Sequence, residues 1–175
     1  AIEELRQSPE KAGGAYYVTD LAAKDITPAP EGFEPFYING YFRHGARQID
    51  DPVTYVRIYE CMETAQATDN LTDFGLAMYQ RLAGQKQNVY YREGDLTQIG
   101  YAQLREMGKR MVENYPSVFQ GDAYLKANAT NVLRVAASMQ SFVQGVTSKR
   151  PELPWAEIDN SKAHLSTIHP YGTQC

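Results

Sequence analysis

Apolar and polar positions alternate with a strand-like period before the first charged cluster of the chain. The alternating residues are Phe36, Ile38 and Phe42 on one face and Tyr37 and Tyr41 on the other. An alternation of this kind is typical of a β-strand. Because both faces carry apolar or aromatic side chains, we expect both to be covered, as in a parallel sheet. The pattern predicts a strand that ends at Arg43 and His44.

The pattern then changes to a helical period. Residues 51–85 predict two helices broken near 67–70, with Asn70 or Thr72 as a cap and Gly84 as a stop. The clearest helix lies within residues 94–116, where Thr97 can cap the start and Pro116 ends the pattern.

Two glycines, Gly100 and Gly108, lie two turns apart inside that clearest helix. A glycine inside a helix costs about 1 kcal/mol relative to alanine. Close packing against a neighbouring backbone would justify that cost, so we expect this helix face to touch another element.

A second strand and helix follow directly. Residues 123–130 predict a short strand, and residues 130–146 predict a helix whose apolar stripe is Val135, Met139, Phe142 and Val146. The order strand, helices, strand, helix is typical of βαβ organisation. The predicted fold class is therefore α/β, with a parallel-type sheet and flanking helices.

The chain divides into three predicted parts. Residues 1–35 form an extended lead-in that ends in a proline-rich stretch, residues 36–147 form the α/β core, and residues 148–175 form an irregular tail. With 175 residues, 43% of them hydrophobic, the chain has the length and composition of one globular domain.

Composition excludes several classes of function. The net charge of −4 gives a field of the wrong sign for binding nucleic acid or an anionic membrane. No apolar run approaches the ~18 residues that a membrane span needs. No signal peptide is visible at the start. Cys61 and Cys175 are too few for a zinc site or a disulfide framework, and they form one bridge or none.

The sharpest local feature is the cluster Arg43-His44-Gly45-Ala46-Arg47, directly after the first predicted strand. The plain alternative is a solvated loop with an incidental histidine. However, ligand sites of α/β sheets lie beyond the carboxyl ends of strands. Two guanidiniums this close also repel each other unless an anion lies between them, and their planar forks suit phosphate oxygens. A histidine inside the cluster would be poised to attack phosphorus.

Arg134 follows the second predicted strand, in the first turn of the next helix. A positive charge there is unfavourable next to the positive end of the helix dipole. A phosphate bound at this helix N-terminus would make the same charge favourable. If both strands are parallel, Arg43, Arg47 and Arg134 converge on one anion. A solvated Arg134 on the helix exterior is the alternative. Lys126 is a further candidate for phosphate binding, with a surface role as its alternative.

Three stretches carry a resemblance to a known family. The cluster fits the signature RHGxR; Leu96, Thr97, Gly100 and Gln103 resemble an LTxxGxxQ helix; Thr130, Arg134 and Ser138 resemble a T-x-x-x-R-x-x-x-S element. Together they span residues 27–146 and resemble the histidine phosphatase superfamily. The similarity is closest to its acid phosphatase and phytase branch, particularly bacterial multiple inositol-polyphosphate phosphatases.

The resemblance implies a mechanism. His44 would be the nucleophile that forms a phosphohistidine, and Arg43, Arg47 and Arg134 would bind the phosphoryl oxygens. It implies no metal or organic cofactor, a phosphorylated small molecule such as an inositol phosphate as substrate, and a periplasmic or secreted location.

The sequence also departs from the family's pattern. Phe42 stands where a glycine often precedes RHG, and Gln48 replaces a proline. The family's acid lies in a later His-Asp or His-Ala-Glu element, and neither pair occurs here, since His164 and His169 are not followed by a carboxylate. The general acid is therefore not found.

Because family members are usually more than twice this length, we expect a fragment whose partner is the C-terminal part of the same enzyme. The resemblance implies that this enzyme hydrolyses phosphomonoesters, and two alternatives to that function remain open. The alternatives are a mutase-like enzyme, for which Glu93 and Asp95 are the nearest acid candidates, and a non-catalytic phosphate-binding module.

Overall fold

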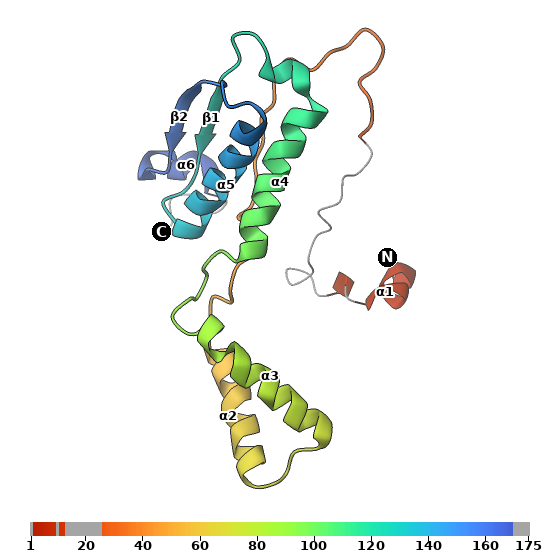
Figure 1. Ribbon diagram of the computed structural model, residues 1–175, viewed down its shortest axis with the longest axis vertical. Helices are drawn as coiled ribbons and strands as arrows, with labels where there is room; N and C mark the ends of the chain where they lie inside the picture. The colour runs from red at the N-terminus through yellow and green to blue at the C-terminus, as the bar shows by residue number, and fades with distance from the viewer. Residues whose placement is uncertain (1, 10, 13–25, 170–175) are drawn as a thin grey trace.

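The computed structural model describes residues 2–9, 11–12 and 26–169, together with the side chains of these residues apart from Thr54, Gln87 and His164 (Figure 1). The elements in chain order are α1 (Ile2–Gln7), α2 (Val53–Ala67), α3 (Asp73–Val89), α4 (Gln98–Asn114), η2 (Pro116–Phe119), β1 (Leu125–Asn128), α5 (Leu133–Lys149), β2 (Trp155–Asp159), η3 (Lys162–His164) and α6 (Leu165–Ile168).

The two strands and the helix between them form a βαβ unit. β1 and β2 pair in parallel as a two-stranded sheet, and α5 is the connection between them. Lys126 pairs with Glu157, and Asn128 pairs with Asp159. The register of the two strands shifts between Leu125 and Lys126. The helices α4 and α5 lie side by side next to this sheet (Figure 1). The predicted α/β class with a parallel sheet and flanking helices is confirmed.

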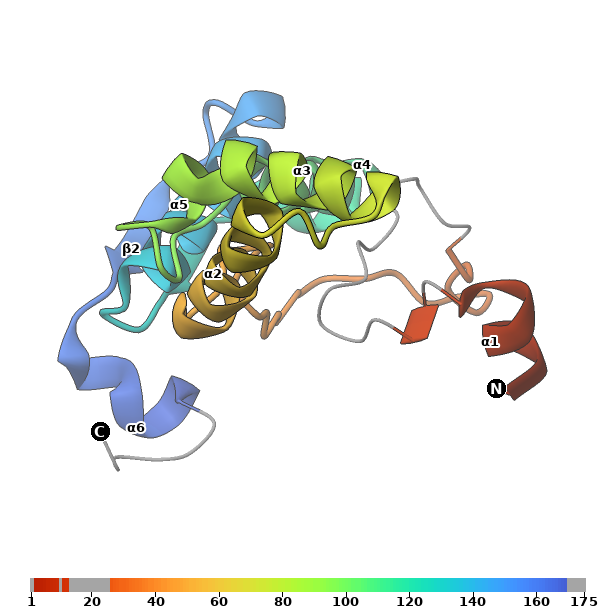
Figure 2. The same cartoon turned by 90° about the horizontal axis from the view of Figure 1, so that it is seen from below.

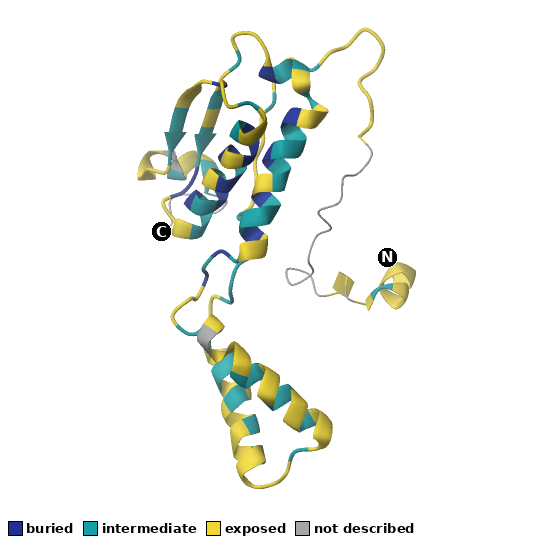
Figure 3. Cartoon of the chain, in the orientation of Figure 1, coloured by how far each residue is buried: buried dark blue, intermediate teal, exposed yellow. Residues whose placement is uncertain are grey.

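The core lies where α4 meets α5. A Cβ added to Gly108 would lie 2.3 Å from the carbonyl oxygen of Phe142, and one added to Gly145 would lie 2.1 Å from that of Arg105. Glycine on both helices therefore lets the two backbones touch, which confirms the close packing expected at Gly108. Val146 is fully buried and belongs to an apolar cluster with Val112, Phe119 and Leu153. Buried positions occur along both α4 and α5 (Figure 3).

The helices α2 and α3 form a hairpin that projects away from the sheet (Figures 1 and 2). Thr72 caps α3, and its Oγ1 accepts a hydrogen bond of 3.1 Å from the N–H of Gly75, as one of the two caps expected. The predicted stop at Gly84 is wrong, because α3 continues to Val89. Nothing lies within 4 Å of a Cβ at Gly84 and its backbone stays helical, so this glycine does not provide the left-handed turn that ends helices.

The predicted strand at residues 36–43 is also wrong. This segment is extended alongside the core, where Ile38 packs against the apolar cluster and the Phe42 ring stacks on Phe142 with centroids 5.3 Å apart. Phe36 is 92% exposed and Tyr37 is 71% exposed, so the two faces are not both covered. A strand needs a hydrogen-bonded neighbour as well as the right side-chain pattern, and no other described segment pairs with residues 36–43.

The segment expected as an irregular tail contains structure. Residues 155–159 form β2, and η3 and α6 follow it. Such short elements leave little periodicity in a sequence, which is why the pattern missed them. At the other end, α1 lies inside the predicted extended lead-in, and it has no buried residue. The domain boundaries stay predictions.

Three further features of the described residues concern membrane-spanning helices, groups that could hold a metal ion and paired cysteines. Within the described ranges no helix is long and apolar enough to cross a membrane. In the same residues no three or more His, Cys, Asp or Glu side chains gather as a metal-holding group. Cys61 is exposed, whereas Cys175 lies outside the described residues, as does any pairing between the two.

Candidate active site

The loop that carries the arginine–histidine cluster lies against the N-terminal end of α4. The backbone N–H and the Oγ1 of Thr97 both donate to the carbonyl oxygen of Ala46, each at 2.9 Å. The same Oγ1 accepts from the N–H of Gly100 at 3.1 Å, which caps α4. The N–H of Gln48 donates to the carbonyl of Asp95 at 2.8 Å. One threonine thus starts the helix and fixes the loop to it.

Glycines bring the loop and the helix into backbone contact. A Cβ on Gly45 would lie 2.5 Å from the carbonyl oxygen of Gly100, and a Cβ on Gly100 would lie 2.2 Å from that of Ala46. One turn further along α4, the Gln103 Oε1 accepts a hydrogen bond of 2.9 Å from the Ala46 N–H. The close contact expected at Gly100 is therefore confirmed, and its partner is the loop.

The helix α5 holds the same loop from the other side. The Oγ of Ser138 accepts a hydrogen bond of 3.0 Å from the Gly45 N–H and donates one of 2.7 Å to the carbonyl of Arg134. All three sequence motifs therefore meet at residues 45–46. This contact explains the spacing of the motifs, since Thr97, Gly100 and Gln103 share one face of α4.

The imidazole of His44 is half-buried and oriented. Its Nδ1 lies 2.8 Å from the carbonyl oxygen of Gly45. Because a carbonyl oxygen only accepts, Nδ1 carries the proton and the other nitrogen, Nε2, keeps its lone pair in the neutral ring. Such a nitrogen is the one able to act as a nucleophile.

The pKa of His44 is lowered from its ordinary value of 6.5. Burial is the largest cause, the hydrogen bond to Gly45 opposes it, and the positive charges of Arg134, Arg43 and Arg47 lower the pKa further. The side chain is thereby kept in its neutral form, and three guanidiniums act on one imidazole.

The structure brings the three predicted arginines together around that imidazole. Arg43 is exposed. Arg47 is 22% exposed, donates from Nη1 to the carbonyl of Gln48 at 2.9 Å, and forms an ion pair with Asp50 through Nη2. The Arg134 guanidinium lies against Gly94, where an added Cβ would be 3.1 Å from Nη1. The positive charges of all three guanidiniums therefore act on the His44 imidazole.

Three buried polar atoms at the junction of β1 and α5 have no hydrogen-bond partner, and they are the only such side-chain atoms among the described residues. They are Asn128 Oδ1, Thr130 Oγ1 and Arg134 Nε. A buried donor without an acceptor is costly unless a ligand supplies one. Sequence reasoning did not select Asn128 as a site residue. The signal that marks it is a polar side chain in the last position of a strand.

Lys126 lies elsewhere on the sheet. Its Nζ is 2.5 Å from Glu157 Oε2 on the neighbouring strand, and the hydrogen bond and charge of that carboxylate raise the pKa of Lys126. This ion pair across the sheet gives Lys126 a partner other than phosphate. Its role in phosphate binding stays a prediction.

The structure also gives the surroundings of the residues considered for the general acid. The Oε1 of Glu93 accepts a hydrogen bond of 3.1 Å from the N–H of Tyr91, and Asp95 lies 3.5 Å from the guanidinium of Arg92. The side chain of His164 lies outside the described part of the structure. His169 follows α6 and is half-buried.

The end of α6 lies beside the segment that leads to His44. The Tyr41 hydroxyl, three residues before His44, donates a hydrogen bond of 2.6 Å to the carbonyl of Ile168. This bond places the last turn of α6 beside the segment that leads to the site.

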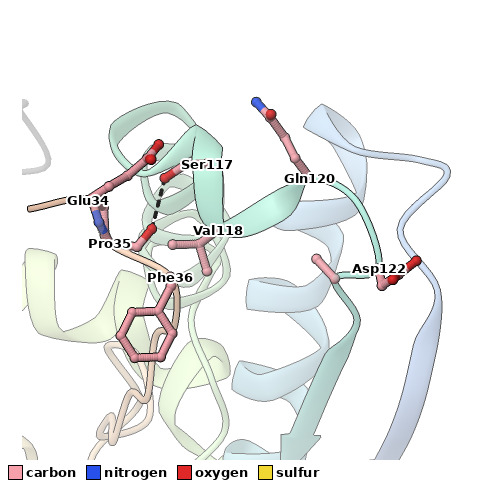
Figure 4. Close-up of a pocket in the computed structure, with 8 residues that line it drawn as sticks. Glu34, Pro35, Phe36, Ser117, Val118, Gln120 and Asp122 are labelled. Carbon is pink, nitrogen blue, oxygen red and sulfur yellow. Dashed lines mark hydrogen bonds between the residues drawn. The ribbon is translucent and has the colours of Figure 1, made fainter.

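An open pocket of about 530 Å³ lies at a different place (Figure 4). It is lined by Glu34, Pro35, Phe36, Ser117, Val118, Gln120, Asp122 and Ala123. Since η2 follows the C-terminal end of α4, the pocket is separated from the His44 loop by the length of that helix, about 25 Å. The carboxylates of Glu34 and Asp122 also disfavour phosphate there.

Comparison with known proteins adds a family. The Histidine phosphatase superfamily (branch 2) profile matches residues 41–173, about three quarters of the chain. A comparison with curated proteins gave no match. The matched residues include all of the motifs that meet at the His44 loop. The chain belongs to branch 2 of the histidine phosphatase superfamily.

Proposed function

We propose that the protein hydrolyses phosphomonoesters through a phosphohistidine on His44. Family membership supports phosphoryl transfer by way of a phosphohistidine. The observation that carries the proposal for this chain is the half-buried His44 ring, whose Nδ1 is tied to Gly45 and whose pKa is lowered by burial and by three arginines. That arrangement supplies a neutral nucleophile and an anion site in one place.

The reaction would run in two displacements. The Nε2 lone pair of His44 attacks phosphorus, an N–P bond forms, and the P–O bond to the alcohol breaks as the alcohol oxygen takes up a proton. Water then attacks phosphorus, a new P–O bond forms as the water gives up a proton to solvent, and the N–P bond breaks. Inorganic phosphate leaves and the ring returns to its neutral state. In both steps Arg43, Arg47 and Arg134 would offset the charge on the equatorial oxygens.

Arg134 would make the most buried of these contacts. Its Nε is a buried donor without a partner, and a phosphoryl oxygen is the acceptor it lacks. The proton for the leaving alcohol is not assigned to a residue of this chain.

Inositol polyphosphates are the proposed substrate class, and a periplasmic or secreted location is the proposed compartment. Both rest on the similarity of the three motifs to inositol-polyphosphate phosphatases of the acid phosphatase branch. A panel of phosphorylated substrates, including inositol hexakisphosphate, tests the first of these.

The decisive experiment is rapid-quench labelling with a ³²P-labelled phosphomonoester, followed by alkaline analysis for acid-labile phosphohistidine. The wild-type chain should be labelled, and His44→Ala should abolish the label. Arg134→Gln should slow labelling by about a hundredfold, as loss of one charge-stabilising donor does. The control is Arg105→Gln, an exposed arginine on α4, which should leave labelling unchanged. Undiminished labelling of His44→Ala would refute the proposal.

The same experiment separates two other functions. A phosphate-binding module without turnover is the second candidate function, since three arginine charges beside His44 would also support binding alone. Binding of inorganic phosphate without any label would support that module. Passage of the label to a phosphorylated sugar acid instead of to water would support a mutase-like enzyme.

A further inference from the structure

The Asp50 carboxylate forms an ion pair with Arg47 and lies near Arg134, and the mechanism above does not use it. We infer that the Asp50 carboxylate competes with the substrate's phosphoryl group for Arg47 and Arg134, which makes Asp50 a residue that determines specificity. The inference rests on the proposed function in so far as the arginine site takes a phosphate.

The first observation is geometric. Asp50 lies three residues after Arg47 and forms an ion pair with its Nη2. A Cβ on Gly94 would lie 3.0 Å from Asp50 Oδ1 and 3.1 Å from Arg134 Nη1. Both atoms are thus close to one point, and no more than about 6 Å separates them. The Asp50 carboxylate is therefore paired with Arg47 and lies near Arg134, the two arginines expected to bind the phosphate.

The backbone builds this arrangement. Gly94 has a φ of +74°, which L side chains rarely adopt, and its N–H donates to the carbonyl of Ile49 at 3.1 Å. This bond fixes the loop of Gly94 next to the residue that precedes Asp50. A side chain at position 94 would displace Asp50 or Arg134, so glycine leaves room for both.

The carboxylate does not satisfy the site fully. Arg134 Nε remains buried without a partner, although Asp50 is nearby. A carboxylate offers two oxygens and one negative charge, whereas a phosphoryl group offers three oxygens and up to two charges. The Asp50 side chain is 53% exposed, so it has room to turn into solvent when phosphate enters.

Competition has a consequence for substrate choice. Binding of a phosphate breaks the ion pair between Asp50 and Arg47. The free energy lost with that ion pair lowers the affinity for every phosphorylated ligand. A substrate with further phosphates next to the reacting one also meets the displaced carboxylate and is repelled by it. Removing the charge should therefore favour multiply phosphorylated substrates more than singly phosphorylated ones.

The test is titration calorimetry of inorganic phosphate with the full chain, at low salt and fixed pH. Since an exposed ion pair is worth at most about 1 kcal/mol, Asp50→Asn should bind phosphate up to about fivefold more tightly than wild type. Asp50→Glu keeps the charge and should bind no more tightly. The matched control is Asp51→Asn, the same charge change at the neighbouring exposed residue, where the amide oxygen still accepts from the Val53 N–H.

Three results would overturn the inference. These are unchanged or weaker phosphate binding by Asp50→Asn, an absence of phosphate binding by every variant, and equal tightening by Asp51→Asn. A measurement on the wild-type chain avoids dependence on a variant that fails to fold. The ¹³C carboxyl resonance of Asp50 should shift during phosphate titration, and a stationary signal contradicts the competition.

The outcome is separable from that of the proposed function. If His44 is labelled but Asp50→Asn gains no affinity, the inference fails and the phosphatase proposal stands. If Asp50→Asn gains affinity but His44 is never labelled, the competition stands at an anion site that does not turn over.

Discussion

At the scale of single residues, the site depends on side chains that hold the loop as much as on those that would touch phosphate. His44 has one ring nitrogen bound to the carbonyl of Gly45, and the N–H groups of Gly45 and Ala46 donate to side chains of two helices. A nucleophile positioned in this way loses little freedom when it reacts. The residue-scale predictions concern the charge on His44 and the bond that holds Gly45.

The first prediction concerns titration of His44. An NMR titration of the imidazole should give a pKa below 6.5 in the phosphate-free protein, because burial and three positive charges disfavour the imidazolium. Arg134→Gln removes the first of those charges and should raise the pKa toward its ordinary value. The exposed Arg105→Gln is the control and should leave it unchanged.

The lowered pKa of His44 also determines how the stability of the folded chain changes with pH. Between the folded and the unfolded pKa of His44, the unfolded chain binds more protons than the folded one. The contribution of His44 to stability is therefore complete above pH 6.5 and is lost as pH falls below 6.5 toward the folded pKa. A titration of His44 at or above 6.5 in the folded chain would contradict both statements.

The second prediction concerns Ser138, which is 3% exposed and accepts the Gly45 N–H. Ser138→Ala leaves that buried donor unpaired and should lower the free energy of unfolding by about 1–3 kcal/mol in urea denaturation. Ser148→Ala is the control, because Ser148 is exposed and bonds only a carbonyl of its own helix. Equal effects of the two substitutions would show that the Gly45 bond contributes nothing particular.

At the scale of elements, the contact between α4 and α5 decides the geometry of the site. α4 supplies Thr97 and Gln103, and α5 supplies Ser138 and Arg134, so any change in the distance between the helices moves the loop of His44. That distance is set by Gly108 and Gly145, whose missing side chains allow the backbones to touch.

The third prediction follows from that contact. Gly145→Ala places a Cβ 2.1 Å from the carbonyl of Arg105, so the helices must separate, and we expect a loss of about 1–3 kcal/mol in stability. Gly84→Ala, in the exposed helix α3 with nothing within 4 Å, should instead gain about 0.5–1 kcal/mol from helix propensity. Urea denaturation of both variants checks the opposite signs. Gly145→Ala as stable as Gly84→Ala would contradict the packing.

These elements also show what a sequence can predict. Helices with strong periodicity and caps were predictable, and Thr72 and Thr97 cap α3 and α4. The site arginines were predictable because their side chains have few reasons to gather without an anion. The extended, unpaired state of residues 36–43 was not predictable, since strand formation depends on a neighbouring strand that the pattern of one segment does not reveal. Asp50 was missed because a carboxylate three residues from an arginine is common on any surface.

At the scale of the whole molecule, charge is unevenly distributed. The chain carries a net charge of −4, yet the described arginines that act on His44 lie together at the N-terminal end of α4. The carboxylates Glu34 and Asp122 line the pocket at its other end. The three guanidiniums would favour an anion near His44 in spite of the overall sign of the chain.

Stability is distributed unevenly as well. α4 and α5 bury several residues each, whereas Val89 is the one described residue of the α2–α3 hairpin that is buried. The hairpin is held mainly by contacts between its own two helices, such as the stack of Tyr59 on Tyr79 with centroids 5.5 Å apart. Segments with few buried apolar contacts open locally at a lower free energy than the core does.

The last prediction is therefore that the hairpin opens without global unfolding. In hydrogen-exchange mass spectrometry, peptides from residues 53–89 should exchange through a low-energy opening that responds weakly to urea. Peptides from α4 and α5 should exchange only with the urea dependence of global unfolding. The loop of His44 is bonded to α4 and α5, so its amides should follow the core in spite of its position at the base of the hairpin. Equal protection of the hairpin and the core would mean that the hairpin is part of the cooperative unit, and that its motion cannot be separated from that of the site.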